Sequence, residues 1–355
     1  MADPTESLPE PLPEQALPEP DDEALLKAPR TLRRREVSRA AGVSLLSARR
    51  FWRALGFPIV TDEDEAFTDE DVAALRAVTG LVRDGLMDEA TALGMTRAVG
   101  RSVDRLATWQ VQLLAEYVAG LDAESAAVAT PDRAAARRTA ELFTQMADRL
   151  EPLVVYAWRR QAASALARIM ADAEPDPHVG AVPDEHDHDP MTTVRAVGFA
   201  DLVSFTRVVR RLSERELAAL VQRFEAVASD VVTAHGGRVV KTVGDEVLFV
   251  CRPGAPAAQI ALGVAEAIGQ DDLLPEVRVG LSTGPVVGRL GDVFGTTVNR
   301  ASRLTALARP GTVLVDVATV HSLADVPDVE VHQLRGRSLR GIGHVVPWVL
   351  RRRPA

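Results

Sequence analysis

Residues 239–250 read VVKTVGDEVLFV, two short runs rich in valine on either side of Val243-Gly244-Asp245. A Gly-Asp pair between apolar runs is a turn signal, and runs of β-branched residues are typical of strands. The stretch therefore predicts a β-hairpin with strands at Val239–Thr242 and Glu246–Val250. The segments on either side of this hairpin decide which fold it belongs to.

Helical and strand-like segments alternate around the hairpin. Before it, Thr193–Ala200 has the pattern of a strand, and Ser213 with Glu216 forms a capping box that begins a helix. After it, a helical pattern at Ala257–Ile268 and a strand at Val277–Ser282 complete the order β-α-β-β-α-β. Further elements are expected at Val298–Ala308 (helix) and near Thr312–Val315, Val329–Leu334 and Val345–Leu350 (strands). The sequence predicts an α+β fold with a ferredoxin-like βαββαβ domain at residues 191–350.

The residues before this domain divide into three parts. Residues 1–28 repeat Pro, Glu, Asp and Leu without a helical or strand period, which is typical of an acidic disordered tail. Residues 29–171 have a helical period with few Pro or Gly, which predicts an all-α domain whose last helix is Glu151–Ala171. Residues 172–190 combine prolines with charges and are expected to form a linker.

The composition limits the class of protein. A length of 355 residues predicts two or three domains, and a net charge of −9 gives no general attraction to nucleic acid or anionic membranes. We find no apolar run long enough to cross a bilayer and no signal peptide, so membrane insertion and secretion are not expected. One cysteine, Cys251, allows no disulfide within the chain and suits a reducing cytosol. We expect a cytoplasmic protein.

Two segments of the C-terminal domain place carboxylates at strand ends. Residues 198–206 read GFADLVSFT, with Asp201 at the end of the predicted strand, and Asp245 lies at the tip of the hairpin. Two carboxylates that converge beside a sheet repel each other unless cations lie between them. Two aspartates, together with waters and phosphate oxygens, form the all-oxygen site that Mg²⁺ prefers.

Two further segments carry polar side chains at helical or turn positions. Residues 291–295 (GDVFG) contain Asp292, and residues 298–304 place Asn299 and Arg303 at i and i+4 on one helix face. Each of these residues alone has a simpler interpretation: an aspartate at a strand end or in a Gly-Asp turn is usually structural. A lysine such as Lys241 in a strand, or an Asn–Arg pair on a helix, is usually solvated. Only their joint order and spacing point to a site.

In that order the residues resemble the class III nucleotide cyclases, and most closely the adenylate cyclases of a soluble actinobacterial type with an N-terminal helical regulatory domain. The resemblance matches six positions: Asp201 and Asp245 to metal ligands, Lys241 and Asp292 to base-reading residues, Asn299 to a ribose-orienting residue, and Arg303 to an arginine that stabilises the transition state.

The resemblance implies conversion of ATP to 3′,5′-cyclic AMP and pyrophosphate, by attack of the ribose 3′-hydroxyl on the α-phosphate. Two Mg²⁺ or Mn²⁺ ions would be held by Asp201, Asp245 and the backbone of Leu202. Asn299 would orient the ribose, and Arg303 would meet the negative charge that develops at the α-phosphate. Backbone N–H groups would bind phosphate oxygens at the start of the next helix; the residues are Leu202, Val203, Ser204, Phe205 and Thr206.

Hydrogen-bond complementarity predicts the choice of base. Asp292 can accept from the adenine N6 amino group, and Lys241 can donate to N1. Guanine would place its O6 acceptor against the carboxylate, which is repulsive, so ATP is the expected substrate. The resemblance further implies a homodimer with active sites at the subunit interface, because one chain carries the full set of residues.

The N-terminal helical domain resembles the regulatory half of that subgroup of cyclases, and the resemblance implies that it restrains the catalytic domain. Three linker histidines, His178, His186 and His188, lie among acidic residues, and such histidines titrate near physiological pH. One hypothesis is that acidification charges them and raises activity. The alternative is a solvated linker in which the histidines are incidental.

Two rival functions remain. Residues 37–44 and 47–52 resemble the helix-turn-helix of MerR-type regulators, so the chain could be a DNA-binding regulator with a cyclase-like ligand-binding domain. The acidic net charge and the acidic tail argue against nucleic acid as a partner. The chain could also be a catalytically silent interaction module, but such domains usually lose one of the six positions, and all six are present here.

Overall fold

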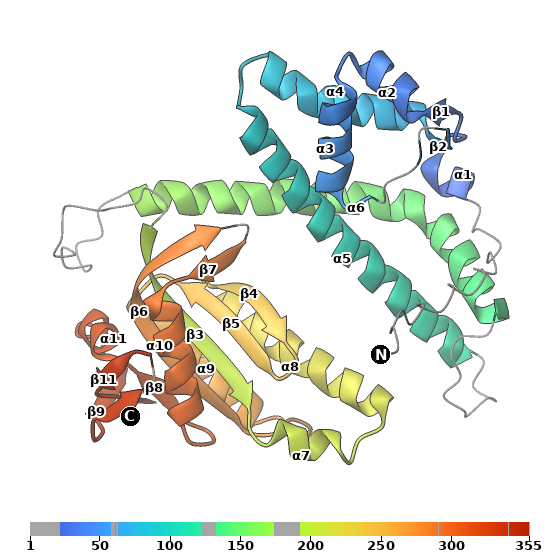
Figure 1. Cartoon of the computed structure of the whole chain (residues 1–355). Helices are drawn as coiled ribbons and strands as arrows, with labels where there is room; N and C mark the ends of the chain where they lie inside the picture. The colour runs from blue at the N-terminus through green and yellow to red at the C-terminus, as the bar shows by residue number, and fades with distance from the viewer. Residues whose placement is uncertain are drawn as a thin grey trace, which may run out of the picture. The chain divides into compact units, whose positions relative to one another are not determined.

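The computed structural model describes residues 22–57, 61, 63–121, 133–173, 192–289, 291–339 and 341–354 (Figure 1). The chain divides into two compact units, Met1–Leu166 and Ala167–Ala355, which we describe separately. The division falls within the long helix α6 (Arg133–Ala173). The sequence placed it in the linker at 172–190, most of which lies outside the described residues.

The first unit is mainly helical, as the sequence predicts. Its core gathers apolar side chains that are almost fully buried, including Phe51, Trp52 and Leu75, with the Trp52 ring packed on those of Phe51 and Phe67. Burial of such side chains stabilises the unit by roughly 1.5–3 kcal/mol each. The helices are α1 (Asp22–Leu26), α2 (Arg34–Ala41), α3 (Leu45–Leu55), α4 (Asp69–Arg83), α5 (Glu89–Leu121) and α6.

The helix-turn-helix-like start of this unit consists of α2 and α3. Gly42 ends α2 with φ of +70°, a left-handed conformation that favours glycine. The Ser44 hydroxyl accepts from the Ser47 amide at 3.1 Å and so caps α3. Two adjacent helices with a glycine-containing turn therefore form where the sequence predicted them.

The first unit differs from the prediction in three places. It contains two short antiparallel strands, β1 (Leu32–Arg33) and β2 (Glu65–Phe67), which are too short to show a period of two in the sequence. Residues at the end of the predicted tail form α1, and Lys27 pairs with Asp148 of α6 at 2.8 Å. Helix α6 begins well before Glu151 and continues through Pro152, although proline is usually found in a first turn.

The second unit contains the predicted βαββαβ motif. Its strands are β3 (Thr192–Leu202), β4 (Arg238–Val243), β5 (Glu246–Cys251) and β6 (Val277–Arg289), and its helices are α8 (Glu214–Ala234) and α9 (Ala255–Gly269). The strands lie in the order β4-β5-β3-β6, all antiparallel, as in a ferredoxin-like sheet. The capping box of Ser213 and Glu216 begins α8 as predicted.

The C-terminal additions extend this sheet and cover its second face. The sheet continues through β8 (Val313–Val315), β12 (Trp348–Arg352) and β9 (Val329–Gln333), and β7 (Asp292–Phe294) pairs with β6. Three more elements are α10 (Thr296–Leu307), α11 (Val317–Ser322) and a hairpin of β10 (Arg337–Leu339) with β11 (Gly343–Val345). The strand expected at Val345–Leu350 is interrupted at Pro347, because proline has no N–H for the ladder.

The sheet has a different apolar layer on each face. Helices α8 and α9 cover the face to which Ala200 and Val247 point, whereas α10 lies on the opposite face with Phe199 and Leu248 (Figure 1). Side chains alternate between the two faces along β3 and β5, and consecutive residues are buried because both faces are covered, so every second side chain lies on the α10 face. Among the described residues no helix combines the length and the hydropathy needed to cross a membrane.

Candidate active site

Asp201 and Asp245 lie next to each other at one end of the sheet. Asp201 is near the end of β3, and Asp245 is in the turn that joins β4 to β5. The Leu202 amide donates to the Asp245 carbonyl at 3.0 Å, which fixes the turn against the strand. Burial raises the pKa of Asp245, and the negative charge of Asp201 raises it further. The structure thus brings the two predicted metal ligands together.

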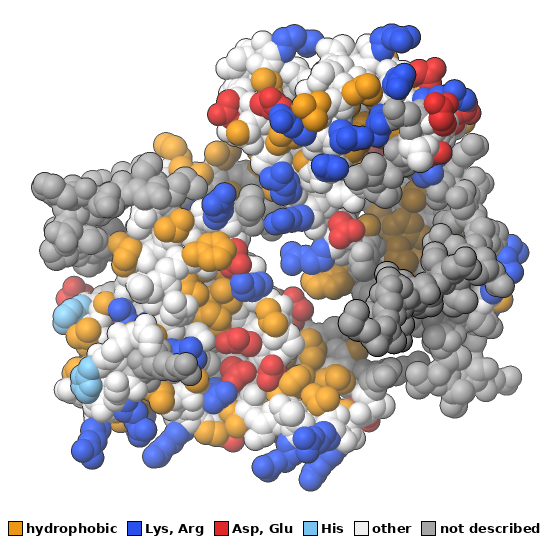
Figure 2. All heavy atoms as spheres, viewed as in Figure 1, with side chains coloured by type: hydrophobic (Ala, Val, Ile, Leu, Met, Phe, Trp, Pro, Cys, Tyr) orange, Lys and Arg blue, Asp and Glu red, His pale blue; other side chains and the backbone are white. Residues whose placement is uncertain are grey.

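A row of charged residues crosses three strands at this point. Asp201 is the register partner of Glu246 on β5 and of Arg278 on β6, and direct partners in antiparallel strands point to the same face. The Arg278 Nε donates to Asp201 Oδ2 at 2.7 Å, and Arg278 Nη1 donates to the Ala306 carbonyl of α10 at 3.2 Å. Burial raises the pKa of Glu246, and the charges of Asp201 and Asp245 raise it further. On this side of the second unit, acidic side chains gather beside apolar ones (Figure 2).

Arg278 and Glu246 are site residues that the sequence interpretation did not single out. Glu246 is the first residue of β5 and Arg278 is the second residue of β6, and a charged residue near a strand end is usually solvated. Only the register across three strands places both beside Asp201, and register is not visible in a single strand's sequence.

The donor set at this end of the sheet fits a hard divalent cation. Carboxylates that raise one another's pKa are stabilised when a cation lies between them, and Mg²⁺ and Mn²⁺ prefer oxygen ligands. Within the described part of the chain no group of three or more His, Cys, Asp or Glu side chains has the arrangement of a complete metal site. Any cation held by Asp201 and Asp245 therefore needs further oxygens from backbone, water or phosphate.

In the predicted phosphate-binding segment, residues 202–206, the first two amides already have acceptors within the chain. The amides of Leu202 and Val203 are not left for phosphate, because they donate to the carbonyls of Asp245 and Glu276 at 3.0 and 2.7 Å. Ser204, in contrast, has φ of +61° and stands at the start of α7 (Phe205–Val209), where the first amides of a helix lack intrahelical acceptors. The segment suited to phosphate is therefore Ser204 to Thr206 rather than the full five residues.

Lys241 and Asp292 form an ion pair, with Lys241 Nζ 2.7 Å from Asp292 Oδ2. Burial acts to raise the pKa of Asp292, but hydrogen bonds from Lys241 and from the Val293 amide outweigh it, and the pKa is lowered. Both side chains keep substantial exposure, 44% for Lys241 and 29% for Asp292. A donor and an acceptor therefore stand side by side at a surface that a ligand can reach.

A β-bulge in β4 directs the Lys241 side chain toward Asp292. The β4–β5 register shifts between Val239 and Lys241, so that Lys241 is opposite Leu248, on the α10 face of the sheet. The next residue, Thr242, faces the other way and its hydroxyl lies 3.2 Å from Oε1 of Glu225 on α8. Bulges commonly redirect a side chain next to an active site.

Asn299 and Arg303 share one exposed face of α10. Neither side chain makes a hydrogen bond or ion pair with another described residue. The helix itself lies close to the sheet, because Gly280 of β6 leaves room for the backbone at Thr305. The structure therefore places these two residues on the α10 face but joins them to none of the four other predicted residues.

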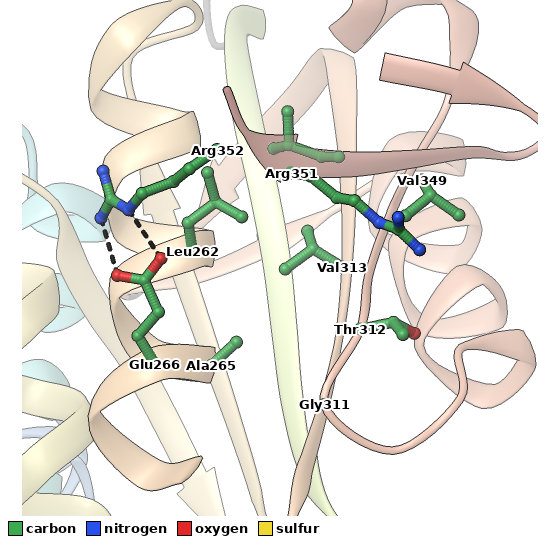
Figure 3. Close-up of a pocket in the computed structure, with 10 residues that line it drawn as sticks. Leu262, Ala265, Glu266, Gly311, Thr312, Val313, Val349, Arg351 and Arg352 are labelled. Carbon is green, nitrogen blue, oxygen red and sulfur yellow. Dashed lines mark hydrogen bonds and ion pairs between the residues drawn. The ribbon is translucent and has the colours of Figure 1, made fainter. Parts of the chain in front are cut away.

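A separate cavity of about 220 Å³ lies between α9, β8 and β12 and includes none of the predicted site residues (Figure 3). On one side of it Arg352 donates to both oxygens of Glu266, at 2.6 and 2.9 Å. This bidentate pair links the last strand to α9 on the face opposite to α10.

The chain is similar in sequence to known proteins. The profile of the adenylate and guanylate cyclase catalytic domain matches residues 187–352. An adenylate cyclase of Glutamicibacter nicotianae is 41% identical over 333 residues, which cover 93% of this chain and 81% of that protein. An adenylate cyclase of Streptomyces coelicolor is 38% identical over 97% of this chain and 94% of its own length. Both matches extend through the N-terminal half as well as the catalytic unit.

A pH-sensitive adenylate cyclase of Mycobacterium tuberculosis is 41% identical over 149 residues, which is 41% of this chain and 37% of that protein. The long matches to the Glutamicibacter and Streptomyces proteins, together with the matched catalytic domain, show that the chain belongs to the adenylate and guanylate cyclase family.

Proposed function

We propose that this protein is an adenylate cyclase that converts ATP into 3′,5′-cyclic AMP and pyrophosphate. The observation that carries the proposal is the Lys241–Asp292 pair, held by a bulge and by the β6–β7 pairing on the same face of the sheet as Asp201. Its ammonium and carboxylate match the acceptor N1 and the donor N6 of adenine. Guanine presents the opposite pattern to Asp292, so the pair favours ATP over GTP.

The residues at the end of the sheet suit the triphosphate and its cations. Asp201, Asp245 and the backbone of Leu202 would hold two divalent cations, Mg²⁺ or Mn²⁺, which when bound lower the pKa of the ribose 3′-hydroxyl and neutralise phosphate charge. Amides from Ser204 to Thr206 donate to phosphate oxygens at the start of α7. Arg278, between Asp201 and α10, is a further donor for the phosphates.

The exposed face of α10 supplies the remaining groups. Asn299 hydrogen-bonds the ribose and holds the 3′-hydroxyl in line with the bond to pyrophosphate, which is an effect of orientation. Arg303 donates to the α-phosphate oxygens as negative charge develops there. No side chain has to act as a nucleophile, because the substrate's own hydroxyl attacks.

We infer a homodimer whose active sites combine residues from both chains. The inference is supported by Asn299 and Arg303, which face solvent and contact none of the carboxylates within the described residues of one chain. A two-fold axis would place α10 of one chain opposite Asp201 and Asp245 of the other, twice.

The first test is production of cyclic AMP from ATP by the full-length protein with Mg²⁺ or Mn²⁺, with GTP as the competing substrate. Metal-dependent product that is lost in Asp245→Ala is expected. Mixing Asp245→Ala chains with Arg303→Ala chains should then restore up to about a quarter of wild-type activity, because half of the randomly mixed dimers have one intact site out of two. No product from the wild-type protein would overturn the proposal, and no restoration on mixing would overturn the shared site.

The helical unit is proposed to regulate the catalytic unit, as in the sequence interpretation. The matches to the Glutamicibacter and Streptomyces adenylate cyclases include this half of the chain, which supports a role common to them. The histidines invoked for pH sensing, His178, His186 and His188, lie outside the described residues. We also place the enzyme in the cytoplasm, on the basis of its single buried cysteine and its ATP substrate.

The alternative of a DNA-binding regulator gains no specific support. Helices α2 and α3 follow each other as in a helix-turn-helix, but one arginine of α3 and the arginine just before α2 are already paired with acids. Arg50 lies 3.3 Å from Glu89, and Arg33 lies 3.1 Å from Glu65. Phosphate contacts at these positions would first have to break those pairs.

A further inference from the structure

Arg300 of α10 lies between the two proposed catalytic residues in the sequence, and its side chain points toward the interior of the unit. In an α-helix Arg300 lies roughly 100° around the axis from Asn299 and about 60° from Arg303. Its Nη1 donates to Asp316 Oδ2 at 3.1 Å. Asp316 follows β8 and is only 2% exposed, whereas the Arg300 side chain is 31% exposed. The exposed catalytic face of α10 is thus linked to a buried carboxylate.

The orientation of Asp316 is fixed from two other elements. Its Oδ1 accepts from the amide and the hydroxyl of Thr319 at 2.9 and 2.7 Å, which caps α11, and from the Thr283 amide at 3.3 Å. Its Oδ2 accepts from the Ser282 hydroxyl at 2.7 Å. A buried carboxylate with this many donors cannot turn without losing hydrogen bonds. Asp316 therefore presents Arg300 with an acceptor in a fixed position.

The other contacts of α10 fix its distance from the sheet. Gly280 allows close approach at Thr305, whose hydroxyl donates to the Phe199 carbonyl at 3.3 Å, and the Thr297 hydroxyl donates to the Pro285 carbonyl at 2.8 Å. These contacts lie near the two ends of the helix. The Arg300–Asp316 ion pair lies between these two contacts along the helix and to one side of the helix axis. A contact at that position opposes rotation of the helix about its axis.

We propose that the Arg300–Asp316 ion pair is a positioning contact for the cyclase reaction. It holds the rotation of α10 and so fixes the direction in which Asn299 and Arg303 point. The inference rests on the proposed roles of those two residues. Both act on the ribose and α-phosphate in the transition state, where a displacement of about 1 Å can lower a rate by roughly a hundredfold.

The test measures kcat and KM for ATP in full-length Arg300→Gln, Asp316→Ser and the double variant. Serine at 316 can still cap α11 through its hydroxyl but cannot pair with Arg300, so it separates the two roles of Asp316. We expect each single variant to lower kcat roughly ten- to a hundredfold, with KM changed less than about twofold. The double variant should be no slower than the slower single variant, because both remove the same contact.

A matched control is Arg352→Gln. It breaks the bidentate pair with Glu266, which joins a strand to α9 on the opposite face of the same unit (Figure 3). We expect Arg352→Gln to lower the Tm but to leave kcat unchanged. A merely structural role for Arg300 would instead make kcat and Tm fall together in both variants, and that result would overturn the inference.

Two further variants keep the test decisive. If Arg300→Gln does not fold, Asp316→Asn keeps the shape and the cap oxygen, and it is expected to show the same loss of kcat. Arg300→Lys retains the charge and should recover part of the rate.

Asn299→Ala and Arg303→Ala belong in the same assay: if they keep wild-type kcat, the proposed roles fail. If they lose it while Arg300→Gln keeps it, only the positioning inference is overturned.

Discussion

Nε of Arg278 lies 2.7 Å from Oδ2 of Asp201, so a carboxylate proposed to hold a metal ion is paired with a cation from the neighbouring strand. The guanidinium also reaches the Ala306 carbonyl at the end of α10. A divalent cation and Arg278 therefore compete for the same oxygen of Asp201.

Replacing Arg278→Gln removes that competition. Without metal, the variant should have a lower Tm than the wild type, because Asp201, Asp245 and Glu246 then repel one another without a counter-charge. Added Mn²⁺, in the absence of nucleotide, should raise the Tm of the variant by more than it raises the wild-type Tm. The control is Arg223→Gln, whose partner Asp271 lies outside the proposed site. Equal Mn²⁺ shifts in all three proteins would contradict the competition.

Gly280→Ala should disturb α10 directly. A Cβ at this position would overlap the Thr305 amide nitrogen and would stand 2.6 Å from the Ala301 carbonyl oxygen. Both are backbone atoms, which can give way only if the helix shifts. We expect a loss of about 1–3 kcal/mol in the free energy of unfolding, measured with urea, together with a lower kcat. Gly288→Ala on the same strand, where a Cβ meets no atom within 4 Å, is the control. The close approach is unimportant if both variants behave alike.

Ser204→Gly should stabilise the phosphate-binding turn. Ser204 has φ of +61°, a left-handed conformation that costs a residue with a Cβ roughly 1–2 kcal/mol relative to glycine. We expect the glycine variant to gain up to about 1 kcal/mol in the free energy of unfolding and Ser204→Val to lose stability. Chemical denaturation of the three proteins measures both changes. A destabilised glycine variant would show that the serine side chain stabilises the turn more than its backbone strains it.

Cys251 should be unreactive in the folded protein. The thiol is 4% exposed, and burial raises its pKa to about 12, so almost no thiolate is present at neutral pH. A thiol reagent such as DTNB should therefore label the native protein very slowly and release one equivalent after unfolding. Leu273→Cys, at a position that is 70% exposed, is the positive control and should react at once. Rapid labelling of the native wild type would indicate that β5 opens locally.

The parts of the fold that the sequence predicted correctly are those with a local signal. The hairpin around Val243-Gly244-Asp245 and the capping box at Ser213 depend on residues close together in the chain, and both form as expected. The ferredoxin-like order follows from the alternation of such segments. Strands β1 and β7 have two and three residues, which are too few to show a period, so no sequence pattern predicts them.

The site residues also divide into those with a local sequence signal and those without one. Asp201, Asp245, Lys241 and Asp292 could be chosen from motif spacing, and the structure brings them together as two pairs. Arg278 could not be found, because its place beside Asp201 depends on the β3–β6 register. The amides of Leu202 and Val203 could not be excluded for the same reason: their acceptors, Asp245 and Glu276, are remote in sequence.

The Lys241–Asp292 ion pair has a consequence for how a nucleotide is selected. On the proposed roles, the two groups satisfy each other before ATP arrives, so adenine exchanges one existing contact for two new ones and gains little net binding energy from them. A mismatched base breaks the same contact and replaces it poorly. The pair therefore acts mainly as a filter: it penalises the wrong base more than it rewards the right one, and tight binding is left to the triphosphate.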